Sequence, residues 1–275
     1  KFDLLPLPEQ RRIAAILDTL DEAIRRTEQV IEKLKQMKQG LLHDLLTRGI
    51  DDNGELRPPP DEAPHLYKDS PLGRIPRGWE TSSVGGLGSV FTGNTPSTSV
   101  PRFYAGTELF VSPGDIGEER WVRHTAKNLS EAGLKVGRTL PPLAVMVTCI
   151  GILGRVGQSQ VRCATNQQIN SIVPNSRVQP AFLYHAASLL RPQLERAAGL
   201  QVIPIINKST FSELLLPVPS PLEQEAIGSR CDTVDNAIHA EKTELDKLRT
   251  LKHGLMDDLL TGRVRVSIPA EEQHP

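Results

Sequence analysis

Cysteine, aromatic residues and long apolar runs are all scarce in this chain of 275 residues. Its three cysteines, Cys149, Cys163 and Cys231, fit no CxxC or Cys/His ligand spacing, so we expect reduced, buried thiols rather than a disulfide or zinc framework. No stretch of about 18 uncharged apolar residues and no basic-then-apolar leader is present, so the sequence supports neither a membrane span nor a signal peptide. We therefore expect a cytoplasmic protein without membrane contact.

The motifs of common nucleic-acid enzymes are also missing. The phosphate-binding pattern GxxxxGK[ST] of translocases is absent, as is the Asn/Asp-Pro-Pro-aromatic site of DNA methyltransferases. The glycine-rich segment 151–157 lacks the Lys-Ser/Thr pair that holds phosphate, and the segment 85–88 does not follow a convincing strand, so both are typical of turns. The seven histidines show no triad or metal spacing. We therefore expect a non-catalytic chain that binds no metal and no cofactor of its own.

The net charge of −1 is unevenly distributed along the chain. Lysine and arginine minus aspartate and glutamate give +1 for residues 1–49, −3 for 50–75, +5 for 76–216 and −4 for 217–275. Only the third segment has the positive bias that attracts phosphates. An ordinary uneven surface would also explain this value, so charge by itself gives weak support for DNA binding.

An internal repeat determines the expected architecture. Residues 9–47 match residues 223–261 at a constant offset of 214, with 17 of 39 positions identical. The sequence Asp-Leu-Leu-Thr ends both copies, and a Leu-Pro-x-Pro segment precedes both. Each copy predicts a long helix with glutamate in its first turn and a stop at Gly49 or Gly262.

Apolar residues in the two copies step by three and four, which is the pattern of a heptad seam. At about 1.5 Å per residue each helix would run close to 60 Å, too long to be covered by one small domain. We therefore expect the helices to pack on each other or on another chain; packing of each stripe on its own domain is the alternative. The seam residues are Leu17, Leu20, Ile24, Ile31, Leu34, Leu41, Leu45, Val234, Ile238, Leu245, Leu248, Leu255 and Leu259, interrupted at equivalent positions by Lys38 and Lys252.

The chain between the repeats changes character twice. Residues 51–71 are acidic, rich in proline and poor in aliphatic residues, which predicts an extended linker. From residue 75 onward, short apolar runs at 109–111, 144–150, 171–173 and 214–216 predict strands, and residues 182–196 predict a helix. Strands without regular βαβ alternation indicate an irregular α+β domain with a mixed sheet.

Five segments then carry a family resemblance when taken in order with the repeat. They are Ile-Pro-Arg-Gly-Trp-Glu at 75–80, Thr-Gly-Asn-Thr-Pro-Ser at 92–97, Val-Ser-Pro-Gly-Asp-Ile at 111–116, Ala-Thr-Asn-Gln-Gln at 164–168 and Leu-Pro-Val-Pro at 216–219. The chain resembles the specificity subunit of type I restriction-modification systems, over nearly its whole length. The resemblance implies a target-recognition domain at 75–217, helical regions at 1–50 and 218–264, a linker at 51–74 and a tail at 265–275.

In that family, two target-recognition domains each read half of a split site on double-stranded DNA. Two helical regions pair antiparallel, set the separation of the half-sites and hold two methyltransferase subunits, which bind S-adenosylmethionine; restriction/translocase subunits join the same complex. This chain has one recognition domain and begins at Lys1, on what resembles the last strand of a preceding domain. We expect either that a first recognition domain is absent from this chain or that this is a half-length subunit that forms a homodimer.

Side chains that can read base edges or hold phosphates occur in the matched segments and near them. Turn or strand capping is the competing explanation for Asn94 and Asn166, and ordinary surface charge for the basic residues. The candidates for DNA contact are Thr92, Gly93, Asn94, Thr95, Ser97, Arg102, Tyr104, Arg155, Arg162, Asn166, Gln167, Gln168 and Lys208.

Two other function classes remain open at this stage. The helices could be a dimerisation device and the middle domain a protein-binding module, which would give a scaffold without salt-dependent DNA affinity. An independent nuclease or methyltransferase is disfavoured by the missing motifs, and activity of the purified chain alone would revive it.

Overall fold

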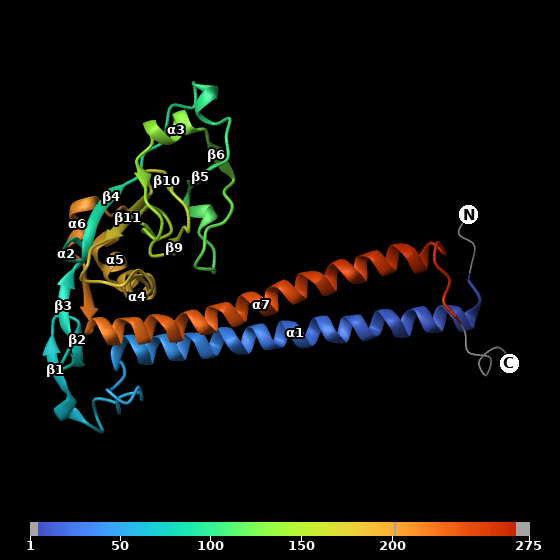
Figure 1. Cartoon of the computed structure of the whole chain (residues 1–275), viewed down its shortest axis with the longest axis horizontal. Helices are drawn as coiled ribbons and strands as arrows, with labels where there is room; N and C mark the ends of the chain where they lie inside the picture. The colour runs from blue at the N-terminus through green and yellow to red at the C-terminus, as the bar shows by residue number, and fades with distance from the viewer. Residues whose placement is uncertain (1–4, 201, 268–275) are drawn as a thin grey trace. The chain divides into compact units, whose positions relative to one another are not determined.

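The computed structural model describes residues 5–200 and 202–267, and the chain divides into two compact units. One unit comprises the chain up to Gln39 and from Val234 onward; the other comprises Gly40–Thr233. Both divisions fall inside a long helix, because α1 spans Leu7–Thr47 and α7 spans Pro221–Leu260 (Figure 1). The two expected long, repeated helices are therefore confirmed. None of the helices in the described part of the chain is long and apolar enough to cross a membrane.

Both long helices end as the repeat predicts. The chain leaves α1 at Gly49 with φ +64° and leaves α7 at Gly262 with φ +71°. Only glycine adopts this left-handed conformation at little cost, which makes the two glycines effective stops.

The first unit is an antiparallel helical hairpin. Arg249 of α7 pairs with Glu28 of α1 at 2.7 Å, and Lys252, three residues further along α7, pairs with the earlier residue Asp21. Partner numbers fall on one helix as they rise on the other, so the helices run in opposite directions. The expected antiparallel, coiled-coil-like arrangement is confirmed (Figure 1).

The lysines that interrupt the apolar seam are neutralised across the hairpin. Lys38 binds Asp235 at 2.5 Å, and Lys252 binds Asp21. The two lysines are equivalent in the repeat, and so are the two aspartates. Antiparallel packing of two related helices thus places each lysine beside the equivalent carboxylate of the other helix.

Burial along the hairpin follows the heptad pattern. Ile31, Ile238, Leu245 and Leu259 are buried, and the remaining seam residues of this unit are half-buried. Ile13, which lies outside the predicted seam, is also buried.

Glu9, at the start of α1, fixes the chain that follows α7. Its carboxylate accepts hydrogen bonds from the Arg265 guanidinium at 2.6 and 2.7 Å and from the backbone N–H of Val266 at 3.3 Å. Hydrogen bonding to this guanidinium holds the pKa of Glu9 below its ordinary value.

Glu223, the equivalent residue at the start of α7, lies in the second unit and has the same kind of partners. Arg57 donates to it at 2.5 and 3.2 Å, and the backbone N–H of Ile50 donates at 3.0 Å. The Trp79 indole N–H adds a bond at 3.0 Å. Each long helix therefore begins with a glutamate that binds the segment just beyond the end of the other helix.

The described residues of the second unit form two four-stranded sheets and two strand pairs, in agreement with the expected α+β class. One four-stranded sheet has the order β6-β5-β10-β7 and contains the one parallel pairing among the described strands, between β5 and β10. Its strands are β5 Glu108–Val111, β6 Lys127–Leu129, β7 Thr139–Leu140 and β10 Cys163–Thr165.

The other four-stranded sheet is antiparallel, with the order β4-β11-β8-β9. Its strands are β4 Gly88–Thr92, β8 Val145–Thr148, β9 Val156–Gln158 and β11 Ile169–Pro174. The antiparallel pairs are β1 Tyr67–Ser70 with β2 Gly73–Pro76, and β3 Glu80–Ser83 with β12 Leu215–Val218.

Short helices complete this unit. The helical expectation for residues 182–196 is met by α4, η4 and α5 in succession. The α-helices are α2 Val84–Leu87, α3 Glu131–Val136, α4 Pro180–Ala186, α5 Arg191–Ala198 and α6 Lys208–Glu213, and the 3-10 helices are η1 Pro64–Leu66, η2 Pro101–Phe103, η3 Pro113–Asp115 and η4 Ala187–Leu190.

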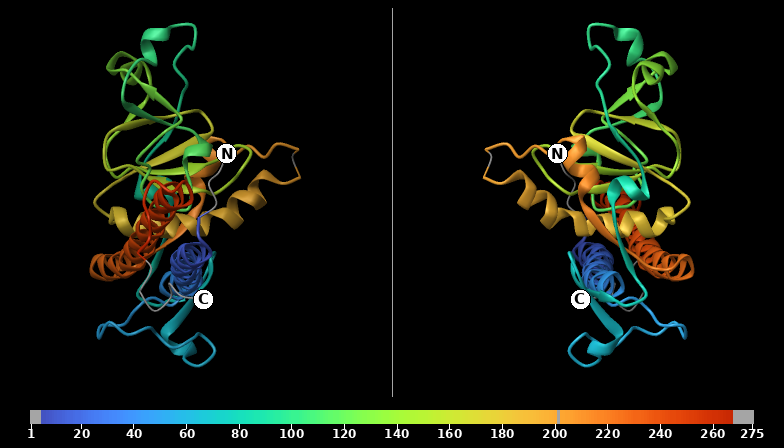
Figure 2. Two further views of the ribbon diagram at one scale, coloured as in Figure 1. Left: turned by 90° about the vertical axis from the view of Figure 1, so that its right-hand side faces the viewer. Right: turned by 90° about the vertical axis from the view of Figure 1, so that its left-hand side faces the viewer.

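The main core of this unit also includes the ends of the long helices. Leu45 and Leu46 of α1 and Ile227 and Cys231 of α7 belong to the same buried cluster as Trp79. Figure 2 shows the β-rich part of the chain from two opposite sides. The last turns of α1 and the first turns of α7 are therefore integral to the domain.

Residues 51–74 are more structured than the expected extended linker. They contain η1, β1 and the start of β2, with Tyr67 and Ala63 buried. The Tyr67 hydroxyl donates to the Pro58 carbonyl at 2.6 Å, which fixes the proline-rich part of this segment to strand β1. Leu56 and Leu72 of this segment are partly buried and pack against the main core.

The three cysteines are free and buried. Burial raises the pKa of Cys149 to about 11 and that of Cys163 to about 12, since the charged thiolate is poorly solvated inside the protein. These two thiols therefore stay protonated at neutral pH.

Candidate nucleic-acid interface

Two of the predicted reading segments meet in space. Residues 92–97 leave the end of β4, and residues 165–168 form the turn between β10 and β11. The pairing of β4 with β11 brings them together, and the backbone N–H groups of Gly93 and Asn94 donate to the carbonyls of Ile169 and Thr165 at 3.1 and 3.0 Å.

Gly93 is required for this close approach. A Cβ atom built on Gly93 would lie 2.2 Å from the carbonyl oxygen of Asn166 and 2.3 Å from that of Thr165. Both contacts are with backbone, which has little freedom to move away. Gly93 therefore has a structural role, and direct DNA contact at this residue stays a prediction.

Several predicted base readers bind one another. Thr95 donates to the side-chain oxygen of Gln167 at 2.6 Å, and the Asn166 amide donates to that of Gln168 at 2.9 Å. Thr92 donates to the Asn170 side chain at 2.6 Å. These bonds preorganise the turn, and they use groups that would otherwise be free for bases.

A third segment, which sequence reasoning missed, joins the first two. The side chain of Asn94 accepts a hydrogen bond from the Arg138 backbone N–H at 2.8 Å and donates to the Val136 carbonyl at 3.3 Å. The Arg138 guanidinium donates to the Thr92 carbonyl at 2.8 Å. We call residues 92–97, 136–138 and 165–168 the polar junction. Asn94 and Arg138 are 44 positions apart, so no local motif could have indicated their contact.

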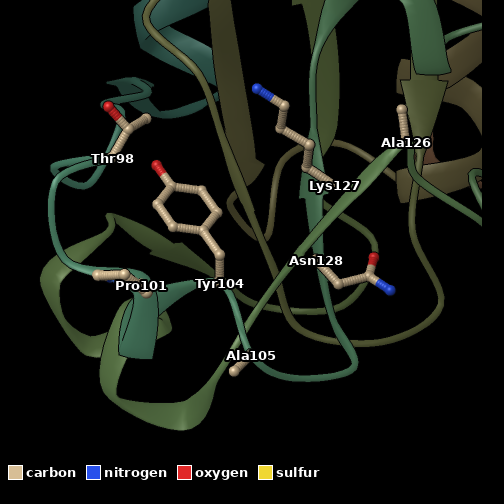
Figure 3. Close-up of a pocket in the computed structure, with 7 residues that line it drawn as sticks. All are labelled: Thr98, Pro101, Tyr104, Ala105, Ala126, Lys127 and Asn128. Atoms are coloured by element: carbon tan, nitrogen blue, oxygen red, sulfur yellow. The ribbon is translucent and has the colours of Figure 1, made fainter.

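A pocket of about 550 Å³ is lined by residues of the segments 98–105 and 126–128. The Tyr104 ring packs edge-on against Phe110, and its hydroxyl donates to the Pro96 carbonyl at 2.5 Å. In Figure 3, the hydroxyl of Tyr104 and the amine of Lys127 lie at the ends of side chains that extend to the same side of the view. The lining residues are Thr98, Pro101, Tyr104, Ala105, Ala126, Lys127 and Asn128.

Lys127 was not singled out from the sequence. Its side chain is exposed and has no ion pair or hydrogen bond within the described parts of the chain. The side-chain amide oxygen of the neighbouring Asn128 accepts a hydrogen bond from the Thr125 hydroxyl at 2.6 Å, and the side-chain N–H groups of Asn128 have no partner in the described part of the chain. The pocket thus offers a lysine amine, an amide and the Thr98 hydroxyl.

The predicted basic contacts differ in their surroundings. Arg162 binds Glu108 at 3.0 Å and Glu131 at 2.5 Å, and these partners raise the pKa of its guanidinium. Arg155 donates weakly to the Ile116 carbonyl at 3.4 Å, and Lys208 is exposed in the first turn of α6. Arg162 is therefore locally neutralised, whereas Arg155 and Lys208 have no carboxylate partner within residues 5–200 and 202–267.

The two remaining candidates, Ser97 and Arg102, do not line the pocket, but each is adjacent in sequence to a residue that does. Ser97 shares a hydrogen bond with Ser99 at 2.7 Å. The Arg102 guanidinium lies over the Phe103 ring, 5.6 Å from its centroid. Both residues are exposed, so their side chains are accessible to a ligand.

A buried ionic network lies elsewhere in the unit and was also missed. Arg120 binds Asp232 of α7 and donates to Gln158 at 2.7 Å, and His185 shares a 2.9 Å hydrogen bond with Asp232. Burial disfavours the Asp232 carboxylate, but the bonds from His185 and Arg120 hold its pKa below the ordinary value. Because Arg120 and His185 are buried, this network fixes the start of α7 to the domain.

Comparisons with known proteins agree with this architecture. The family model "Type I restriction modification DNA specificity domain" matches residues 76–250. The type I restriction enzyme HindI specificity subunit of Haemophilus influenzae is 31% identical over 202 residues, covering 69% of this chain and 42% of the relative. The type I restriction enzyme MjaVIII specificity subunit of Methanocaldococcus jannaschii is 22% identical over 280 residues, covering 97% of this chain and 62% of the relative.

Two solved structures share the fold. The HsdS subunit from Thermoanaerobacter tengcongensis matches with a TM-score of 0.54 and 19% identity, over 95% of this chain and 60% of that chain. The type I restriction-modification S subunit from M. genitalium matches with a TM-score of 0.63 and 17% identity, over 95% and 62%. This chain therefore spans less than two thirds of the length of these relatives and structures.

Proposed function

The chain belongs to the type I restriction modification DNA specificity family, and on this premise we propose that it reads one half of a split DNA site and docks methyltransferase subunits through its helices. The polar junction carries the DNA-reading part of the proposal. It gathers amide, hydroxyl and guanidinium groups from three segments into one preorganised cluster, and these are the groups that read base edges.

Charge supports the placement of DNA on the second unit. Residues 76–216 carry a net charge of +5, although the whole chain carries −1. Lys127, Arg155 and Lys208 are exposed cations in this segment and would bind backbone phosphates. Phosphate contacts position the duplex, and the polar junction would supply the sequence information.

The helical hairpin supports the docking of partners. Large apolar side chains remain exposed on it, among them Met37 on α1 and Leu251 on α7. Exposed apolar residues on a long amphipathic hairpin favour contact with further helices. The proposed partners are two methyltransferase subunits, with restriction/translocase subunits joining through the complex.

In this proposal, the partner subunits catalyse the reactions and this chain does not. The relatives are named as specificity subunits, in agreement with the expectation of a non-catalytic chain. S-adenosylmethionine would be bound by the methyltransferase subunits. Because the target is cellular DNA, the proposed location is the cytoplasm. A half-length subunit would provide the second half-site by forming a homodimer.

The decisive experiment combines co-purification with selection of DNA. The chain is expressed with the methyltransferase subunit of its own system, and the purified complex selects from a library of random duplexes. We expect a stable complex that enriches a defined half-site and methylates it. A complex that forms but enriches no sequence would support a scaffold function and overturn the DNA-reading proposal.

A further inference from the structure

We propose that Arg138 reads a guanine of the half-site through the free N–H groups of its guanidinium. This assignment rests on the proposed function and identifies one specificity-determining residue within it. Neither a sequence motif nor the family match singles out Arg138; its position in the polar junction does so.

The first reason is charge. Arg138 is the one cation among residues 92–97, 136–138 and 165–168. It is exposed, and no carboxylate within the described chain lies at ion-pair distance from it. Arg162 has a similar exposed guanidinium but is bound by two glutamates. The positive charge of Arg138 is therefore available to a ligand, whereas that of Arg162 is compensated within the protein.

The second reason is hydrogen-bonding capacity. An arginine guanidinium has five N–H donors. Among the residues that the structure describes, that of Arg138 forms one hydrogen bond, from Nη1 to the Thr92 carbonyl. A guanine presents two acceptors, O6 and N7, in the major groove, and arginine binds both with two parallel N–H groups. The free donors of Arg138 are sufficient for this contact without breaking its bond to Thr92.

The third reason is preorganisation. The backbone N–H of Arg138 donates to the Asn94 side chain at 2.8 Å, and Asn94 is itself fixed by its backbone bond to Thr165. The base of the Arg138 side chain and one end of its guanidinium are therefore both held. A guanidinium that is held in this way loses less conformational entropy on binding than that of a free surface arginine. This favours a directional contact with a base over a diffuse contact with phosphate.

A charge-preserving substitution tests the assignment. Arg138→Lys keeps the positive charge but loses the two-pronged geometry. Arg162→Lys is the matched control, because it makes the same change at a neutralised arginine. Each variant, in complex with the methyltransferase subunit, is titrated with the selected duplex and with duplexes that change one base pair at a time, at several salt concentrations.

We expect Arg138→Lys to melt like the parent and to keep the salt dependence of binding. Its preference at one G·C pair should fall about 10- to 100-fold, with other positions unchanged. Arg162→Lys should retain the parent's preference at every position. Arg138→Gln, which removes both the positive charge and the guanidinium group, should lose the same single preference as Arg138→Lys.

Two results would overturn the inference while leaving the proposed function intact. One is a parent-like preference at every position in both Arg138 variants, which would make Arg138 a structural residue. The other is an equal loss of affinity for all duplexes, which would make it a phosphate contact. If the parent complex itself prefers no sequence, the proposed function is overturned, and the inference that rests on it is overturned as well.

Discussion

At the scale of single residues, Lys127 and Arg162 carry the same formal charge but differ in what surrounds it. Lys127 lies at a pocket with no carboxylate within its reach in the described chain, whereas Arg162 binds Glu108 and Glu131. A free cation gains the attraction of a phosphate, and a paired one must first give up its partners. Of these two residues, we therefore expect only Lys127 to contribute to DNA affinity.

Substitution by glutamine tests this difference. Lys127→Gln should weaken binding of all duplexes alike and lower the slope of log K against log salt by about one unit. Arg162→Gln should leave both quantities unchanged. The measurement is a salt titration of each complex with selected and unrelated duplexes; equal effects of the two substitutions would remove Lys127 from the phosphate-binding surface.

Gly93 gives a stability prediction for the polar junction. Gly93→Ala should lower the free energy of unfolding by about 2–3 kcal/mol, because the new Cβ atom would overlap two carbonyl oxygens. Gly114→Ala is the control, since nothing lies within 4 Å of the added atom, and its effect should stay within about 1 kcal/mol. Chemical denaturation of both variants measures the difference, and a parent-like Gly93→Ala would show that the two segments can separate.

Residue chemistry in the sequence indicated part of the site but not its assembly. The Thr-Gly-Asn-Thr and Asn-Gln-Gln segments were identified because hydroxyl and amide groups gather there. Arg138 and Lys127 were missed because isolated basic residues have no local signature. Their relevance depends on strand register and on the absence of nearby carboxylates, and neither can be read from one sequence.

At the scale of elements, the long helices were predictable because two strong signals coincide in them. A 39-residue repeat and a heptad pattern both specify the same boundaries, and the stops at Gly49 and Gly262 follow from glycine chemistry. The β1–β2 hairpin was not predicted, because its strands contain few apolar residues. Tyr67, Ile75 and Pro76 are its buried residues, and three residues are too few to produce a periodic signal.

The hairpin of α1 and α7 can be tested with two leucines of one helix. Leu245 is 7% exposed and Leu251 is 52% exposed. Leu245→Ala should cost about 2–3 kcal/mol of stability, because it removes buried apolar area and leaves a cavity. Leu251→Ala should change stability by no more than about 0.5 kcal/mol.

Both substitutions change helix propensity equally, so the difference between them reports packing alone. Thermal melting of the isolated chain, followed by circular dichroism at the helix signal, measures it. If the two variants melted together, the predicted seam would not be the packing face of α7.

At the scale of the whole molecule, the boundary of the recognition domain inferred from sequence differs from the compact unit in the structure. Pattern changes placed the domain at 75–217, whereas the compact unit extends over Gly40–Thr233. The reason is that heptad periodicity continues through the ends of both helices, although their terminal turns pack into the domain core. Periodicity identifies a helix but not the body against which each of its turns is buried.

This difference leads to a prediction about exchanged domains. A chimera that replaces residues 76–216 with those of another specificity subunit keeps Leu45 and Ile227 of the host against a foreign core. A chimera that replaces residues 40–233 transfers these helix ends together with their own core and joins the chains within the heptad repeat. Both should read the half-site of the donor, because both transfer the whole polar junction.

The two chimeras should differ in stability rather than in DNA choice. Mismatched packing in a core costs about 1–3 kcal/mol, so the 76–216 chimera should melt several degrees below the 40–233 chimera. Binding to the methyltransferase subunit should survive in both, since the helical hairpin is unchanged. Melting curves, co-purification and sequencing of selected duplexes measure the three properties. A donor domain that failed to change the selected half-site in either chimera would contradict the division of labour between the domain and the hairpin.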